Sequence, residues 1–179
     1  MEQKNKTRAL TLSAVFSALT VVILYFASLW PTGQLALPAL ASFFIAAAVI
    51  ESGILHGVYV YIAAAVLSLV ILPDKTVPLL FTVFFGHYPV VKCLIEKLKP
   101  VLLQWTLKLA VFLISLTIIL IFMRTLVFTS LSVVEKTPSA VIICAVGAAI
   151  FILYDYGYSK AIGLYLGQVS KYMKKGRSR

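Results

Sequence analysis

One aspartate lies deep inside an apolar stretch of this sequence. Asp155 lies near the middle of the run from residue 138 to 169, between Tyr154 and Tyr156 and close to Tyr158. A carboxylate in a hydrocarbon layer is expected to have a polar partner or a functional role, because moving an unpaired charge out of water costs a large free energy. Asp155 and Tyr158 are therefore candidate ligand contacts. A structural hydrogen bond or ion pair that joins two helices explains Asp155 equally well.

A second candidate site lies where a glycine and a proline interrupt an aromatic segment. Gly86 and Pro89 bracket His87 and Tyr88, and this combination distorts a helix and frees backbone groups. Irregular backbone at membrane depth is tolerated only where protein buries it or where it lines a cavity. His87 and Tyr88 are therefore candidate ligand contacts. Trp30 could cover a pocket from outside, although interfacial anchoring is the ordinary role of such a tryptophan.

Lys108 lies about two helical turns into another apolar run, and Gln104, Trp105, Phe112 and Ser115 share its face. The ordinary interpretation is that its ammonium group extends along the helix to the membrane surface. If it pointed inward, Asp155 would be its natural counter-ion.

Signatures of enzymes and metal sites are absent from the sequence. It has no nucleophile elbow, no HExxH, no phosphate-binding loop and no catalytically spaced pair of carboxylates. Cys93 and Cys144 are far apart and lack metal-binding spacing. We therefore expect neither an enzyme nor a metal or cofactor protein.

Composition indicates a membrane protein. Hydrophobic residues make up 61% of the 179 residues and charged residues 12%, more apolar surface than a soluble domain of this size can bury. The net charge of +10 lies mostly in short segments between and beyond the apolar runs, which argues against a nucleic-acid partner. We predict an all-α bundle of six transmembrane helices, with the fourth short and distorted. The predicted spans are at about residues 9–30, 35–50, 54–72, 78–91, 101–128 and 138–169, in a single membrane domain, 1–179, with a basic tail at 170–179.

The distribution of basic residues predicts the orientation. With six spans, eleven lysines and arginines fall on one side, while Lys75, Lys136 and Arg124 lie toward the other. Cytoplasmic loops carry the excess of positive charge, so both termini are expected to be cytoplasmic.

The first span has one face of small residues. Ala14 and Ala18 are four residues apart, and Thr11 and Ser17 lie on the same side. This spacing allows the backbones of two membrane helices to approach closely. The second helix could belong to the same bundle or to a separate membrane partner.

Taken together, these features resemble the substrate-binding S component of energy-coupling factor (ECF) transporters, the bacterial vitamin-uptake class. The resemblance covers the whole chain at the level of topology, and its one motif is Ala14-xxx-Ala18. It implies a high-affinity solute-binding subunit in the bacterial plasma membrane. It also implies that helix one docks on a transmembrane coupling subunit, which works with ATPase subunits. No signature of a particular vitamin is present, so no ligand residue is carried over from the family.

A scaffold protein of a different class remains open. Small multi-helix factors of bacterial cell shape and division, the MreD type among them, bind protein partners and no solute. They would show a small-residue docking face too, whereas a solute that copurifies would favour the transporter subunit.

Overall fold

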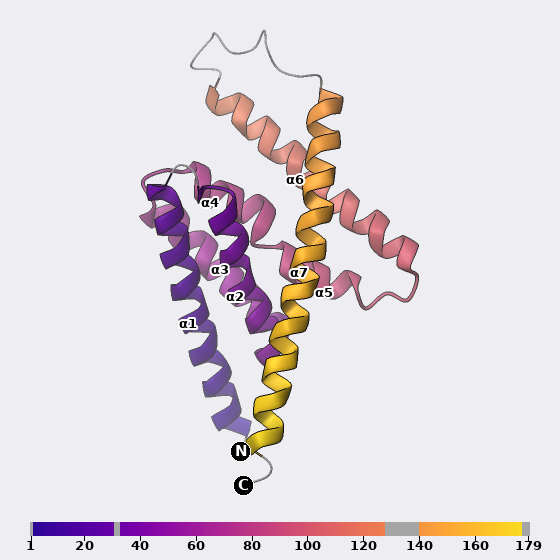
Figure 1. The fold of residues 1–179 in the computed structure, drawn as a ribbon. Helices are drawn as coiled ribbons and strands as arrows, with labels where there is room; N and C mark the ends of the chain where they lie inside the picture. The colour runs from indigo at the N-terminus through magenta and orange to yellow at the C-terminus, as the bar shows by residue number, and fades with distance from the viewer. Residues whose placement is uncertain (1, 31–32, 128–139, 177–179) are drawn as a thin grey trace. The chain divides into compact units, whose positions relative to one another are not determined.

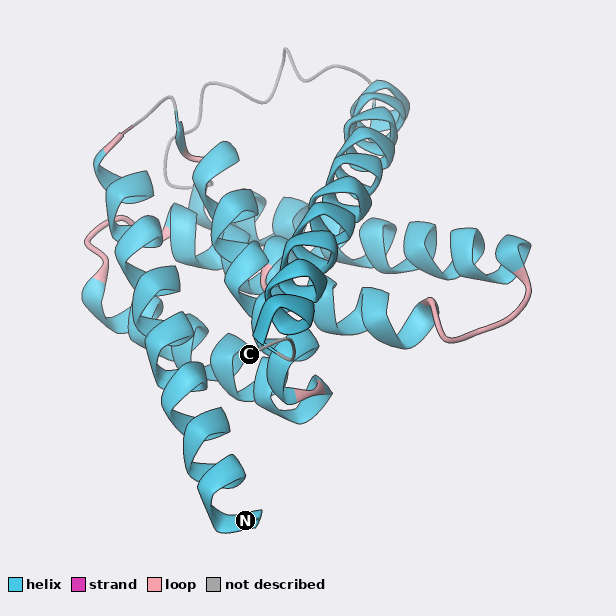
Figure 2. Ribbon diagram, turned by 60° about the horizontal axis from the view of Figure 1, so that its bottom comes forward, coloured by secondary structure: helices cyan, strands magenta, loops and turns pink. Residues whose placement is uncertain are grey.

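All regular secondary structure in the described part of the chain is helical. The computed structural model describes residues 2–30, 33–127 and 140–176, and these ranges contain no strand (Figure 1, Figure 2). They form two units, residues 1–128 and residues 129–179, each of which is described by itself. The predicted all-α class is thus confirmed for the described residues.

Six helical segments match the six predicted runs. The fourth was predicted to be short, at 78–91, and this is wrong, because the segment Thr76–Ile95 has 20 residues. It is divided into three pieces, and the last helix continues past residue 169 into the basic tail. In the first unit the elements are α1 (Glu2–Leu29), α2 (Ala36–Ser52), α3 (Ile54–Ile71), α4 (Thr76–Leu80), the π-helix η2 (Phe81–Phe85), α5 (Tyr88–Ile95) and α6 (Val101–Val127); the second unit holds α7 (Ala140–Gly176).

Four described segments are long and apolar enough to cross a bilayer: Lys6–Leu29, Ile54–Ile71, Thr76–Ile95 and Val101–Ile119. They indicate a multi-pass membrane protein. α2 is also apolar but has 17 residues, slightly fewer than the roughly 20 that span the hydrocarbon core.

The helices α1, α2 and α3 pack together in the first unit (Figure 1). Small residues dominate the buried part of α2, with Ala41, Ser42, Ala46 and Ala48 all inaccessible or nearly so. Small side chains let helix backbones approach closely, so that dispersion contacts hold the bundle together where lipid provides no hydrophobic drive.

α2 and α3 form a tight hairpin with one residue between them. Gly53 makes the link with φ 93°, a conformation that side chains disfavour. The hairpin brings Gly57 so near α2 that a Cβ there would meet the Val49 side chain. Two glycines thus permit the sharp reversal of the chain.

Candidate functional site

The fourth span is broken near its middle. The Gly86 N–H donates to the Phe81 carbonyl at 2.6 Å, one residue further back than in an α-helix. Pro89 then lies at the start of α5, where its missing N–H leaves no gap in the hydrogen bonding. The predicted distortion is confirmed, and it begins earlier in the chain than the bracketing Gly86 and Pro89 suggest.

Tyr61 on α3 supports the break. Its hydroxyl donates to the Thr82 carbonyl at 3.0 Å, which in a regular helix would accept from Gly86. A Cβ on Gly86 would lie 2.8 Å from the Tyr61 ring, so glycine is what allows the ring to lie there. Sequence reasoning missed Tyr61, although a glycine inside an apolar helix is itself a sign of close approach.

His87 links the break to α6. Its Nε2 lies 3.4 Å from the Ser115 Oγ, and the direction of that hydrogen bond depends on the histidine tautomer. One turn away on α6, Phe112 packs edge-on against Phe84, with ring centroids 5.6 Å apart. The break thus carries a polar contact and an aromatic contact to the same face of α6.

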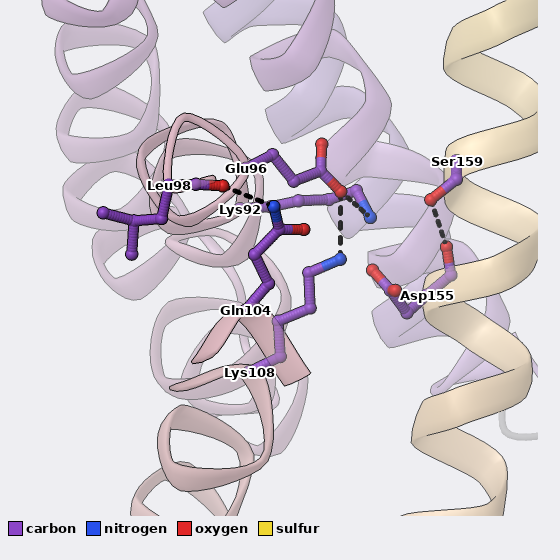
Figure 3. Close-up of polar contacts among 7 residues, drawn as sticks. All are labelled: Lys92, Glu96, Leu98, Gln104, Lys108, Asp155 and Ser159. Atoms are coloured by element: carbon purple, nitrogen blue, oxygen red, sulfur yellow. Dashed lines mark hydrogen bonds and ion pairs between the residues drawn. The ribbon is translucent and has the colours of Figure 1, made fainter. Parts of the chain in front are cut away.

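Tyr88 and the following turn lead to a buried charged cluster. Tyr88 is buried, and the Lys92 Nζ lies 5.9 Å from the centre of its ring. Lys92 and Lys108 both contact the same Glu96 oxygen, Oε1, at 2.9 Å (Figure 3). Although the two lysines are buried, the Glu96 side chain is 43% exposed. One carboxylate therefore joins α5 to α6.

The two lysines change the acidity of Glu96. Partial burial acts to raise the pKa of the carboxyl group, but hydrogen bonds from Lys92 and Lys108 and their positive charges outweigh it. The pKa of Glu96 is therefore lowered from its ordinary value of 4.5. Glu96 is ionised at neutral pH and acts as a fixed anion between two cations.

The ordinary interpretation of Lys108, an ammonium group that extends to the membrane surface, is wrong, because the side chain is buried against Glu96. Lys108, Phe112 and Ser115 are buried, whereas Trp105 is 40% exposed. Lys108 points into the protein toward Glu96, a partner that sequence reasoning missed. The clue was the spacing of Lys92 and Glu96, which places them one helical turn apart.

The remaining candidate contacts are Trp30 in the first unit and two residues of the second unit. Trp30 is exposed at the end of α1, as an interfacial anchor would be. Asp155 and Tyr158 lie on α7, in the second unit, where the Ser159 hydroxyl donates to the Asp155 carbonyl at 2.9 Å (Figure 3). Tyr158 packs on Tyr154, with ring centroids 5.4 Å apart. Roles for these three residues in ligand binding stay predictions.

The small-residue face of α1 is partly exposed. Thr11, Ala14 and Ala18 are exposed, whereas Ser17 is buried with Ser13. The buried serine hydroxyls donate to carbonyls one turn back, Ser17 to Ser13 at 2.9 Å, so the buried face satisfies its own donors. Ala14 and Ala18 are therefore on the accessible side of the helix.

Among the described residues, no group of three or more histidine, cysteine or acidic side chains is placed to hold a metal ion. Comparisons of the chain with protein families, with curated proteins and with solved structures find no match.

Proposed function

We propose that this protein is a solute-binding membrane subunit of the ECF transporter type, which captures a small organic micronutrient and docks on a coupling subunit through α1. The observation that carries the proposal is the break in the fourth span, with Tyr61, His87 and Ser115 gathered around it. A purely structural bundle has no need to interrupt a membrane helix with polar groups.

Physical precedent supports a ligand at such a break. π-Helical turns inside α-helices occur frequently at functional sites, and discontinuous membrane helices form the binding sites of many transporters. His87 offers a donor or an acceptor there, and Phe84 and Phe112 offer aromatic surface. This combination suits a small, planar organic molecule with at least one polar group.

The proposed orientation places both termini in the cytoplasm of a bacterial cell and six spans in the plasma membrane. It is supported by the eleven basic residues that fall on one side. A ligand would then enter from the opposite side, as uptake requires.

The exposed side of α1 supports docking. Ala14 and Ala18 leave a shallow strip on which another helix could pack, while the opposite side of α1 is occupied by packing in its own unit. Docking at this face and the internal packing of α1 therefore do not compete.

Mass spectrometry of the detergent-purified protein tests the solute-binding role. We expect a copurified small molecule whose amount falls in His87→Ala and stays constant in Tyr59→Phe. The Tyr59 side chain is half exposed and lies about 200° around α3 from Tyr61, the residue that contacts the break. Asp155→Asn tests the second candidate contact in the same way. A protein that carries no solute yet captures membrane partners would favour the MreD-type scaffold instead.

Tryptophan substitutions test the docking face. Ala14→Trp and Ala18→Trp should abolish assembly with a coupling subunit and leave the isolated protein folded. Leu19→Trp is the matched control, since Leu19 is also exposed on α1 but lies on another face. If Ala14→Trp unfolds the isolated protein, the small face serves internal packing and the docking role is wrong.

A further inference from the structure

The turn between α5 and α6 has a charge distribution and an exposed surface that the proposed function does not use. It connects the candidate spans Thr76–Ile95 and Val101–Ile119, so it lies where the hydrocarbon layer ends. We name residues 96–105 the α5–α6 corner.

The acidic residue of this corner, Glu96, is paired with lysines that lie outside the corner. The Glu96 carboxylate accepts from the buried Lys92 and Lys108 through one oxygen. Lys97 and Lys99 are both exposed, and within the described residues neither side chain forms an ion pair or hydrogen bond. The outer surface of the corner therefore presents two ammonium groups that are not paired with a carboxylate.

Large apolar side chains lie directly beside these lysines. Val101 is 64% exposed, Leu102 83% and Trp105 40%. The Gln104 side chain donates to the Leu98 carbonyl at 2.6 Å (Figure 3), and its backbone N–H donates to the Pro100 carbonyl at 3.2 Å. These hydrogen bonds fix the loop, so the cationic and apolar groups keep a constant arrangement.

We propose that the α5–α6 corner is a binding surface for anionic phospholipids, with Lys97 and Lys99 on the headgroup phosphates and Leu102 and Trp105 against the acyl chains. Each lysine near an anionic membrane surface raises affinity by a factor of about five. Tryptophan lies preferentially at this level of the bilayer. The proposal is independent of the solute and of docking through α1.

The adjoining apolar side chains favour a lipid over a free anion. A site for inorganic phosphate needs donors that converge on the ion and has no use for exposed leucine. A lipid presents phosphate and hydrocarbon together, in the same order in which the corner presents lysine and leucine.

Trp105 provides a local probe. The chain has two tryptophans, so the full-length Trp30→Phe variant leaves Trp105 as the one fluorophore of its kind, at the corner itself. Phosphatidylglycerol with brominated acyl chains, titrated into the detergent-solubilised protein, should quench Trp105 at a lower concentration than brominated phosphatidylcholine does. Raised salt should abolish this preference, because it screens exposed charges.

Charge variants test whether Lys97 and Lys99 cause the preference for phosphatidylglycerol. In the Trp30→Phe background, Lys97→Gln with Lys99→Gln should reduce the preference for phosphatidylglycerol by about 25-fold, while Lys97→Arg with Lys99→Arg should retain it. A preference that survives the glutamine pair, or one lost equally in the arginine pair, would overturn the proposal. So would displacement of phosphatidylglycerol by inorganic phosphate at low concentration. If the glutamine pair fails to fold, the salt dependence of the unmodified corner decides alone, and a salt-independent preference refutes the proposal.

Discussion

Tyr61 donates to a carbonyl that the fourth span has left without its usual helical donor. The Gly86 N–H bonds to Phe81, and the Tyr61 hydroxyl takes its place at Thr82. A buried acceptor that loses its donor costs about 1–3 kcal/mol. The phenolic hydroxyl of Tyr61, which comes from another helix, therefore contributes to the stability of the break.

We expect Tyr61→Phe to lower the free energy of unfolding in detergent by about 1–3 kcal/mol, measured by denaturant titration with circular dichroism. Tyr59→Phe is the matched control, since Tyr59 lies on the same helix and is half exposed. Equal effects of the two changes would show that the bond to Thr82 contributes nothing.

Glu96 makes stability depend on pH. Its pKa is lower in the folded protein than the ordinary 4.5, so its contribution is fully present above that value and is lost as the pH falls through the folded pKa. We expect the melting temperature to fall on acidification below about pH 4.5. In the Glu96→Gln variant the melting temperature should be lower at pH 7 and should fall less on acidification.

The loss in Glu96→Gln at neutral pH should be about 1–2 kcal/mol, less than for a fully buried pair because the Glu96 side chain is partly exposed. If the melting temperature of Glu96→Gln falls on acidification as much as that of the unmodified protein, Glu96 is not the group that makes stability depend on pH.

At the scale of elements, the break in the fourth span requires a residue without a Cβ at position 86. A Cβ on Gly86 would lie 2.8 Å from the Tyr61 ring and 3.0 Å from the Phe81 ring. The Phe81 ring is fully buried and the Tyr61 ring is held by its hydrogen bond to Thr82, so neither ring can yield freely.

Gly86→Ala should therefore destabilise the protein by about 1–3 kcal/mol, in spite of the higher helix propensity of alanine. Gly163→Ala on α7 is the control, because a Cβ there meets nothing within 4 Å, and we expect it to be neutral or slightly stabilising. Thermal unfolding of the two variants side by side gives the comparison. Similar melting temperatures would mean that the bundle relaxes around the break at little cost.

Sequence alone predicts the helices well and their partners poorly. Hydropathy and the Gly86–Pro89 bracket place the spans and the distortion, since both depend on local chemistry. The links of Lys108 to Glu96 and of Tyr61 to Thr82 depend on how neighbouring helices are rotated against each other. When most faces of a helix are apolar, periodicity does not specify that rotation. The same limit applies to Ser17, whose burial separates it from Ala14 and Ala18.

At the scale of the whole molecule, the proposed topology rests on the charge distribution, and one exception to that distribution has a local cause. The Lys75 ammonium donates to the carbonyls of Leu69 and Leu72 at 2.8 Å each, which caps the end of α3. Its place on the less basic side is thus explained by capping.

We expect cysteines introduced at positions 75 and 136 to react with an impermeant thiol reagent in intact cells, and one at position 97 to react only after the cells are opened. Cys93→Ser and Cys144→Ser remove the native thiols first. If position 97 is labelled in intact cells, the proposed orientation is wrong.

The single residue between α2 and α3 bears on how the protein enters the membrane. One residue spans at most about 3.6 Å, so the end of one helix and the start of the next can never separate. There is no polar loop between them that could stay at the membrane surface while the second of the two helices is still being inserted. We therefore expect residues 36–71 to enter the membrane together as one preformed hairpin. The insertion of the longer helix, α3, would then bring the slightly short α2 into the lipid with it.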